Sequence, residues 1–359
     1  MHLNQITFTR FLAALTVVFF HYGSEVFPAN IPFFGQAFQA GPIAVNYFYL
    51  LSGFIMAIAY FSADQSKTLN KKRYWIARFA RIYPVYLLAL LLVAAGKFKD
   101  PGFTTDLLLN LSLLQAWIPG YPLSLNSPGW SLSVEAFFYA AFPFILIFIQ
   151  RIGLKKVTLL ALLLWFTTQL IHTYWLNSTA YQAKNLVHDA IYYHPLMHIN
   201  AFILGVVVGA YFKQNSQKIE TTFGQYSNVI LFVSSAILIL LLAQPQPAKI
   251  AILNLDIALT NGLIGPLFLL FIVALAINKG VIAKTLNLPI LILLGEASYS
   301  LYILQRPVYG IYDRTIGKYL AIPEAAHFYL YLVVLIAISI ASYKLFETPL
   351  REYIKKIAK

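Results

Sequence analysis

The segment TFTRFLAALTVVFFHYGSEVF, residues 7–27, is the first long apolar run of the chain and contains Arg10 and His21. Ionisable residues inside a membrane helix are costly, so a span that keeps two of them usually has a use for them. At about 100° per residue, the steps from Arg10 to His21 make three turns plus roughly 20°, which places both side chains on one helix face, ~16 Å apart along the axis. The pairing suggests chemistry that connects two sides of a membrane.

The composition defines the class of protein. Hydrophobic residues make up 60% of the chain and charged residues 11%, whereas a soluble surface needs roughly a quarter charged residues. Runs of about twenty apolar residues, the length that crosses a bilayer as a helix, recur along the sequence. We therefore predict an all-α, polytopic membrane helix bundle of about ten transmembrane helices, forming one domain over residues 1–359. The predicted spans are residues 7–27, 41–62, 79–96, 130–150, 155–176, 195–213, 226–243, 260–278, 289–312 and 326–346.

Two further apolar stretches are too short to cross a bilayer. Residues 107–118 and 250–259 contain Asn110, Gln115 and Asp256 and fall well below spanning length. We interpret them as interfacial or re-entrant segments.

The basic residues orient the predicted bundle. Positive charge concentrates in cytoplasmic loops of membrane proteins. With both termini in the cytoplasm, most lysines and arginines fall on that side, so the net charge of +13 is largely a topology signal and nucleic-acid binding explains it poorly. The first helix lacks the features of a cleaved signal peptide, and we expect it to stay in the protein. The two loops that carry this signal contain Lys67, Lys71, Lys72, Arg73, Arg78 and Arg81, and Arg151, Lys155 and Lys156.

The sequence also excludes some chemistry. No cysteine is present, so there is no disulfide framework, thiol nucleophile or thiolate metal site. The histidines show no HExxH spacing, and we expect no bound metal.

Arg10 and His21 each have a plain structural interpretation. Arg10 at a helix entrance could simply extend to the cytoplasmic headgroups, which position alone favours. A neutral imidazole such as His21 can form a structural hydrogen bond inside a bundle, and taken alone this is as good an interpretation as catalysis.

A second cluster, RYWIARFARIYP at residues 73–84, contains Arg78 and Arg81 three positions apart. On a helix these two side chains point to nearly the same side. They could serve only to set the topology. Alternatively, the paired guanidiniums form an anion site at the cytoplasmic mouth, because their fork geometry matches phosphate oxygens such as those of coenzyme A.

A third cluster is SPGWSLSVE, residues 127–135. Trp130 is expected at the outer membrane interface, where aromatic belts lie. Glu135 would then lie ~7 Å below the outer edge and His21 ~9 Å below it. A carboxylate and an imidazole at one depth can form a base and its orienting partner, although an isolated glutamate could instead tie helices together.

Other polar residues fall at a similar depth. His198 on the sixth predicted span, and Gln305 with Arg306 on the ninth, would approach the outer third, and their convergence on His21 is a hypothesis. Ser52 and Gly53 are more typical of close helix packing than of a nucleophile.

Together these motifs resemble the acyltransferase 3 family. Each is weak alone, but six of them occur in the family order from the first helix to the last. They are Arg10 and His21 with ten residues between them, FYLLSGF at 48–54, RxxRIYP at 78–84, WSLSVE at 130–135, SYSLY at 298–302 and FETPLR at 346–351.

The resemblance implies O-acylation of a carbohydrate. An acyl-CoA from the cytoplasm, most simply acetyl-CoA, would donate the group as a co-substrate, with no permanently bound cofactor. The acceptor would be a cell-surface or polyprenyl-linked glycan, such as O-antigen, capsule or exopolysaccharide, outside a bacterial cytoplasmic membrane. The chain ends at Lys359 and resembles members without a fused soluble hydrolase-like domain.

The resemblance also implies roles for individual residues. His21 would be the catalytic histidine and Glu135 would support it, while Arg10, Arg78 and Arg81 would bind the donor. This chain departs from the family at Gln305, where members often have a histidine, and an amide has no proton-transfer role. Residues implied to bind the acceptor or support the site are Trp130, Ser133, Tyr299, Tyr302 and Arg306.

Other mechanisms and classes remain as alternatives. The acyl group could pass directly to the sugar or through an acyl-histidine intermediate. A transporter or flippase would also keep buried polar residues, but it often shows two related halves and no internal repeat is present here. A non-enzymatic scaffold gives no reason for His21 and Glu135 at one depth.

Overall fold

The chain folds almost entirely into helices, which the computed structural model describes over residues 3–62 and 69–358. Lys67, one of the predicted cytoplasmic cations, lies outside the described residues. In the first half of the chain the helices are α1 (Asn4–Tyr22), α2 (Pro32–Phe38), α3 (Gly41–Tyr60), α4 (Lys71–Ala94), α5 (Phe103–Leu111), α6 (Trp130–Ile152) and α7 (Leu154–Leu176). In the second half they are α8 (Leu186–Tyr192), α9 (Pro195–Phe223), α10 (Ser227–Leu242), α11 (Gly265–Ile277), α12 (Val281–Leu286), α13 (Pro289–Thr315), α14 (Glu324–Ser342) and α15 (Thr348–Ile357).

Every predicted span overlaps a helix. Among the described residues, six helical stretches are long and apolar enough to cross a membrane, which supports a polytopic membrane protein. α1 and α13 are not among these six, because they carry the polar residues of the site. The eighth prediction is wrong in length: α11 has 13 residues, about 20 Å of helix against the ~30 Å of a bilayer core.

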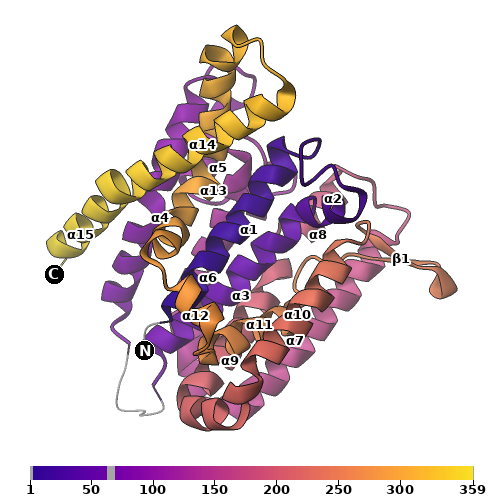
Figure 1. Ribbon diagram of the computed structural model, residues 1–359, viewed down its shortest axis with the longest axis vertical. Helices are drawn as coiled ribbons and strands as arrows, with labels where there is room; N and C mark the ends of the chain where they lie inside the picture. The colour runs from indigo at the N-terminus through magenta and orange to yellow at the C-terminus, as the bar shows by residue number, and fades with distance from the viewer. Residues whose placement is uncertain (1–2, 63–68, 359) are drawn as a thin grey trace.

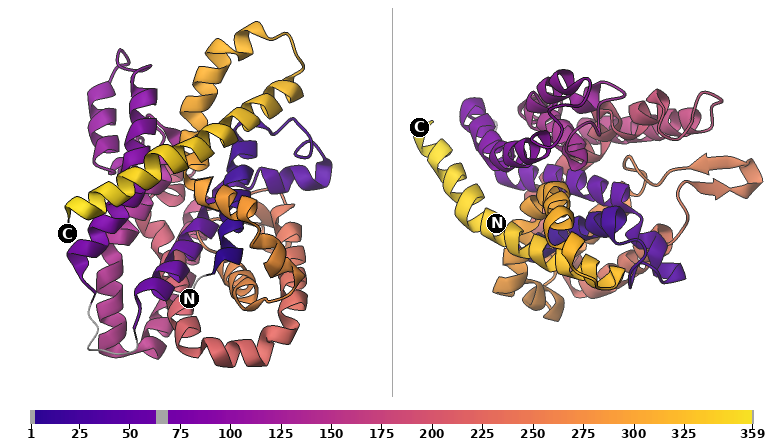
Figure 2. Two further views of the ribbon diagram at one scale, coloured as in Figure 1. Left: turned by 60° about the vertical axis from the view of Figure 1, so that its left-hand side comes forward. Right: turned by 90° about the horizontal axis from the view of Figure 1, so that it is seen from above.

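The segment at residues 250–259 is too short to span, as predicted, and it forms strands instead of a helix. Strands β1 (Ala248–Ile250) and β2 (Leu255–Ile257) form an antiparallel hairpin, with Lys249 opposite Asp256. The hairpin projects from the side of the bundle (Figures 1 and 2). Asn254 in the left-handed region closes its turn. The other short segment, residues 107–118, contains α5 and the brief 3-10 helix η1 (Gln115–Trp117), in agreement with a segment too short to span.

α1 runs through the middle of the bundle and packs along α13 (Figure 1). The two backbones approach very closely at Gly295 of α13, where an added Cβ would lie 2.2 Å from the carbonyl oxygen of Thr7. α3 and α9 meet in the same way at Gly205, whose Cβ would lie 2.1 Å from the carbonyl oxygen of Leu50. Small residues allow such contacts between membrane helices, and Gly53 faces α9 there, as the packing interpretation predicts.

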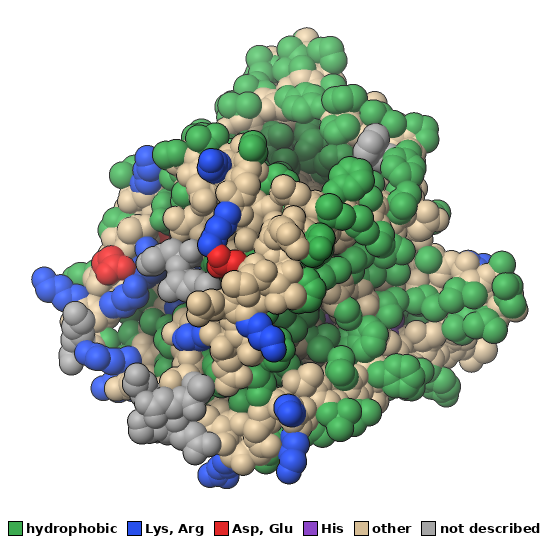
Figure 3. All heavy atoms as spheres, turned by 60° about the horizontal axis from the view of Figure 1, so that its bottom comes forward, with side chains coloured by type: hydrophobic (Ala, Val, Ile, Leu, Met, Phe, Trp, Pro, Cys, Tyr) green, Lys and Arg blue, Asp and Glu red, His purple; other side chains and the backbone are tan. Residues whose placement is uncertain are grey.

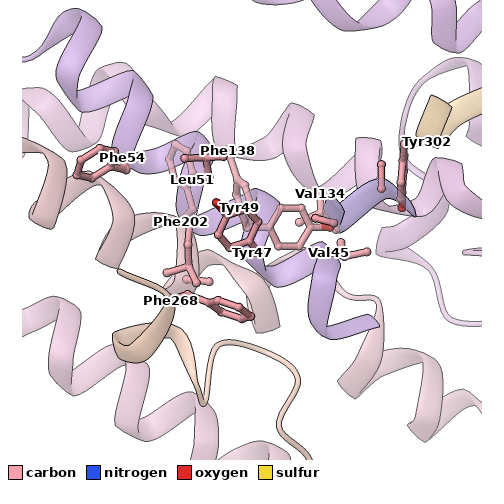
Figure 4. Close-up of a cluster of buried hydrophobic side chains, with 14 of the residues drawn as sticks. Val45, Tyr47, Tyr49, Leu51, Phe54, Val134, Phe138, Phe202, Phe268 and Tyr302 are labelled. Atoms are coloured by element: carbon pink, nitrogen blue, oxygen red, sulfur yellow. The ribbon is translucent and has the colours of Figure 1, made fainter. Parts of the chain in front are cut away.

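The core between these helices is aromatic. Phe138 of α6 stacks on Phe202 of α9 with ring centroids 4.7 Å apart, and its ring meets the edge of Tyr49 at 5.0 Å. Figure 4 shows these rings together with Tyr47 and Phe268. The cluster fixes α3, α6 and α9 relative to one another and so supports one side of the site.

Two prolines inside helices leave backbone carbonyls without their usual amide partners, and side chains replace them. Pro143 cannot donate to the carbonyl of Tyr139, which instead accepts from the indole of Trp75 at 3.2 Å. Pro307 likewise frees the carbonyl of Ile303, which accepts from the buried amide of Asn126 at 3.0 Å. These bonds tie α4 to α6, and the loop before α6 to α13.

Charge is unevenly distributed over the surface. Lys and Arg side chains gather on the face that comes forward in Figure 3, whereas hydrophobic side chains cover the flank above it. Lys279, just before α12, forms an ion pair with Glu220 near the end of α9. α14 continues through the π-helical segment η6 (Tyr343–Glu347) into α15 as a long slanting run across one side (Figure 2).

Candidate active site

A cavity of about 320 Å³ lies between α1, α3, α4, α6 and α13. Each of these five helices carries one of the sequence motifs and contributes residues to the cavity wall. The polar side chains that line it are Thr7, Arg10, Tyr49, Ser52, Tyr60, Arg78, Arg81, Ser131, Glu135, Tyr139, Glu296, Ser298, Tyr299 and Tyr302.

The three predicted donor-binding arginines share this cavity. Arg10 is half-buried on α1, and the charges of Arg81, Glu296 and Glu135 all act on it. The charges of Glu296 and Glu135 also act on Arg81. The fold therefore brings the arginine of α1 and those of α4 into one cationic group. The nearby carboxylates compensate part of its positive charge.

Arg78 is held by aromatic side chains. Its Nη2 donates to the hydroxyl of Tyr60 at 3.3 Å, and its guanidinium carbon lies 5.7 Å from the ring centroids of both Tyr60 and Tyr139. Its Nε is buried and has no hydrogen-bond partner among the described residues. A guanidinium between two rings keeps donors for an incoming anion, since cation–π contacts leave its edge unoccupied.

Glu135 belongs to this cavity. Its Oε1 accepts from the hydroxyl of Tyr139, one turn along α6, and from Ser52 Oγ at 3.5 Å. The described contacts do not include the predicted pairing with His21. The depth estimate placed the two residues at one level but carried no information on helix rotation, and α6 directs Glu135 toward the arginines.

His21 lies at the other end of α1, beyond the residues that line the cavity. Its Nδ1 is 2.9 Å from Oε1 of Gln305 on α13, and the charge of Arg306 acts on it. The predicted convergence on His21 is therefore confirmed for Gln305. His198 points elsewhere: it is buried, and its Nε2 bonds the carbonyl of Tyr192 at 2.9 Å.

The remaining predicted site residues divide into two groups. Tyr299 and Tyr302 line the cavity. The hydroxyl of Tyr299 bonds the carbonyl of Ile82, and that of Tyr302 bonds the carbonyl of Pro128 at 3.2 Å. These bonds connect α13 to α4 and to the loop that enters α6, so both tyrosines shape the cavity as well as line it.

Trp130 and Ser133 lie outside the cavity lining. Trp130 is only 8% exposed, with its ring 5.0 Å from Tyr193 and 5.4 Å from His198. The indole is thus covered by Tyr193 and by His198 of α9, and its expected position at the membrane interface stays a prediction. Ser133 Oγ donates to the carbonyl of Leu113 at 2.5 Å and fixes the loop before α6.

Two carboxylates near the arginines were missed in the sequence. Glu296 lines the cavity; it lies one helical turn before Tyr299, a spacing that could have placed it on the same face. Glu347, in the closing FETPLR motif, is 2% exposed and accepts from Ser300 Oγ at 3.2 Å. Its charge acts on Arg10 and Arg81, which only the tertiary fold could reveal.

The helices and the charged cavity define a polytopic membrane protein with a site buried inside its bundle. Residues 3–344 match the family described as acyltransferase domain, and the chain belongs to this acyltransferase 3 family. Membership confirms the resemblance inferred from the six motifs.

Individual relatives agree with this assignment. The chain is similar to acyltransferase MdmB of Streptomyces mycarofaciens, at 33% identity over 170 residues that cover 44% of this chain and 42% of the relative. It is similar to the exopolysaccharide production protein ExoZ of Rhizobium meliloti, at 26% identity over 329 residues, 88% of this chain and 91% of the relative. Peptidoglycan O-acetyltransferase OatA of Listeria monocytogenes matches at 28% over 141 residues, 34% of this chain and 22% of the relative. The chain thus spans less than half of MdmB, and no solved structure matches it.

Proposed function

We propose that the protein is a membrane O-acyltransferase that moves an acetyl group from cytoplasmic acetyl-CoA to a hydroxyl of a cell-surface or polyprenyl-linked glycan. We place it in a bacterial cytoplasmic membrane, with both termini in the cytoplasm. The observation that carries the proposal is the cavity in which Arg10, Arg78 and Arg81 meet, on the same helix whose far end holds His21. The name of OatA, a peptidoglycan O-acetyltransferase, and that of ExoZ support an acetyl donor and a polysaccharide acceptor.

The arginines suit the phosphates of the donor. Charged hydrogen bonds between guanidinium and phosphate are roughly twice as strong as neutral ones, and a low-dielectric bundle strengthens them further. A cavity of about 320 Å³ is at the lower end of ligand pockets, which suits the thin pantetheine arm with the adenosine end outside. Glu135 and Glu296 would compensate the guanidiniums while no donor is bound.

The thioester would leave this cavity toward His21. Phe48 and Tyr302 both line the cavity, and their rings meet edge to face with centroids 5.9 Å apart. The carbonyl of Tyr302 accepts from Gln305, which bonds His21. Tyr302 thus lines the cavity with its side chain and contacts the partner of His21 with its carbonyl, and we propose that displacement of this ring pair opens a path for the acetyl group.

In the proposed chemistry, the acetyl group moves from the sulfur of CoA to an oxygen of the sugar. The sugar hydroxyl oxygen attacks the acetyl carbon, and His21 takes its proton. The C–S bond breaks, and the departing CoA thiolate takes up that proton. In the alternative route the imidazole itself attacks first, CoA leaves, and the acetyl group passes from His21 to the sugar in a second step.

Purified protein in liposomes tests the proposal. Radiolabelled acetyl-CoA on one side and a glycan acceptor on the other should give labelled glycan, and His21→Ala should abolish the transfer while the protein still inserts. Labelled glycan from the His21→Ala protein would refute the assignment of His21. Movement of unmodified glycan or solute, with no label transferred, would favour the transporter or flippase class instead.

A further inference from the structure

We propose that Gln305 is a positioning residue that holds His21 in the tautomer with its proton on Nδ1, so that Nε2 carries the free lone pair. The inference rests on the proposed function only in assigning that lone pair to the transfer step. The arrangement itself follows from hydrogen-bonding rules applied to two side chains, those of Gln305 and His21, and to the backbone carbonyl of Tyr302.

The orientation of the Gln305 amide is determined by its second partner. Its nitrogen, Nε2, lies 2.7 Å from the backbone carbonyl oxygen of Tyr302. A carbonyl oxygen can only accept, so the atom that faces it must be the NH₂ group. With the amide reversed, two oxygens would face each other at 2.7 Å in a residue that is 0% exposed, where no water could relieve the repulsion.

The fixed amide then determines the state of His21. With Nε2 on Tyr302, the oxygen Oε1 is the atom that faces His21 Nδ1 at 2.9 Å. An amide oxygen has no proton to give, so the bond exists only when Nδ1 carries the hydrogen. A neutral imidazole has one N–H group, and Nε2 is therefore the nitrogen that can take a proton or attack an acyl carbon.

Two side chains from other segments hold the backbone around Gln305 in place. Tyr331 of α14 donates its hydroxyl to the carbonyl of Gln305 at 3.0 Å. Asn126 bonds the carbonyl of Ile303 that Pro307 leaves free. Catalytic groups need locked supporting residues to hold their geometry, and α13 is locked here at the turn that faces the end of α1.

This arrangement also explains the departure from the family at this position. An amide cannot transfer protons, but it offers both an acceptor and a donor, and Gln305 uses both. The Nε2 group of Gln305 donates to the carbonyl of Tyr302 and so fixes the orientation of the amide, and Oε1 then accepts from the imidazole of His21 and orients it. The position therefore serves the orientation of His21 through hydrogen bonding that an apolar residue of similar volume could not provide.

Nitrogen-15 NMR of histidine-labelled protein in liposomes, at a pH where imidazole is neutral, tests the proposal without an activity assay. The His21 signals are identified by their loss in His21→Gln. We expect the Nδ1–H signature in the wild type and a shift of population toward Nε2–H in Gln305→Leu. Gln244→Leu is the matched control, since Gln244 also donates to a backbone carbonyl but is exposed, and it should leave His21 unchanged.

Activity measurements separate this inference from the proposed function. If acetyl transfer is present, Gln305→Leu should lower kcat at least tenfold with an unchanged KM for acetyl-CoA, and Gln305→Glu, which keeps an acceptor oxygen, should recover part of the rate. An Nε2–H signature in the wild type, or the same signature in wild type and Gln305→Leu, would overturn the inference even if transfer occurs. An Nδ1–H signature in a protein without transferase activity would instead leave the inference standing and refute the function.

Discussion

The contact between α1 and α13 gives the sharpest prediction about the fold. In Gly295→Ala, the new Cβ would lie 2.2 Å from the carbonyl oxygen of Thr7, more than 1 Å inside the 3.4 Å at which ordinary contact begins. The obstacle is backbone, which cannot rotate away, so the helices must separate. Overpacking usually costs 1–3 kcal/mol, and we expect about 3 kcal/mol here because both helices are fixed elsewhere in the bundle.

Gly310→Ala is the matched control on the same helix, since nothing lies within 4 Å of its Cβ position. Alanine in a helix is favoured over glycine by roughly 0.5–1 kcal/mol. Thermal unfolding in detergent, followed by tryptophan fluorescence, should show a clear fall in Tm for Gly295→Ala and an unchanged or raised Tm for Gly310→Ala. Equal Tm values for the two variants would refute the close approach of α1 and α13.

Three further predictions concern the cavity and its supports. Arg78→Ala should raise the KM for acetyl-CoA about tenfold or more, because a charged hydrogen bond contributes ~1.5–3 kcal/mol. Steady-state kinetics measure this, with Arg151→Ala, at an exposed position, as the control. Equal changes in KM for the two variants would favour a role of Arg78 in topology alone. Glu135→Gln should change the KM for acetyl-CoA more than kcat, since the carboxylate of Glu135 acts on the arginines. A loss confined to kcat would instead support the predicted role of Glu135 as the partner of His21. Asn126→Ala should lower the free energy of unfolding by about 1–3 kcal/mol, because the carbonyl of Ile303 loses its partner; an unchanged denaturation midpoint would contradict this.

Much of the fold could be predicted from the sequence, because long apolar runs have few options in a bilayer other than helices. The predicted starts at residues 41, 130 and 289 agree with the helix starts, where proline and glycine mark the boundaries. α4 begins at Lys71, eight residues before the prediction, because its first two turns carry the basic cluster and look polar. The hairpin at 248–257 was not predicted, because hydropathy alone cannot distinguish a short helix from a pair of strands.

The sequence indicated part of the cavity lining but not how the side chains pair. Spacing placed Arg78 and Arg81 together, and the family resemblance grouped them with Arg10, as the cavity confirms. Pairing depends on how each helix is rotated about its axis, which depth along the helix does not determine. Glu135 was for this reason assigned to His21, whereas the described contact of His21 is with Gln305.

The close helix contacts also restrict how the cavity can open. α1 is held to α13 at Gly295, and α3 is held to α9 at Gly205, in each case backbone against backbone. Three of the five walls therefore belong to two rigid pairs. Entry of a donor must rely on movement of α4 or α6, and Trp75, which bonds the carbonyl of Tyr139, would make these two helices move as a unit.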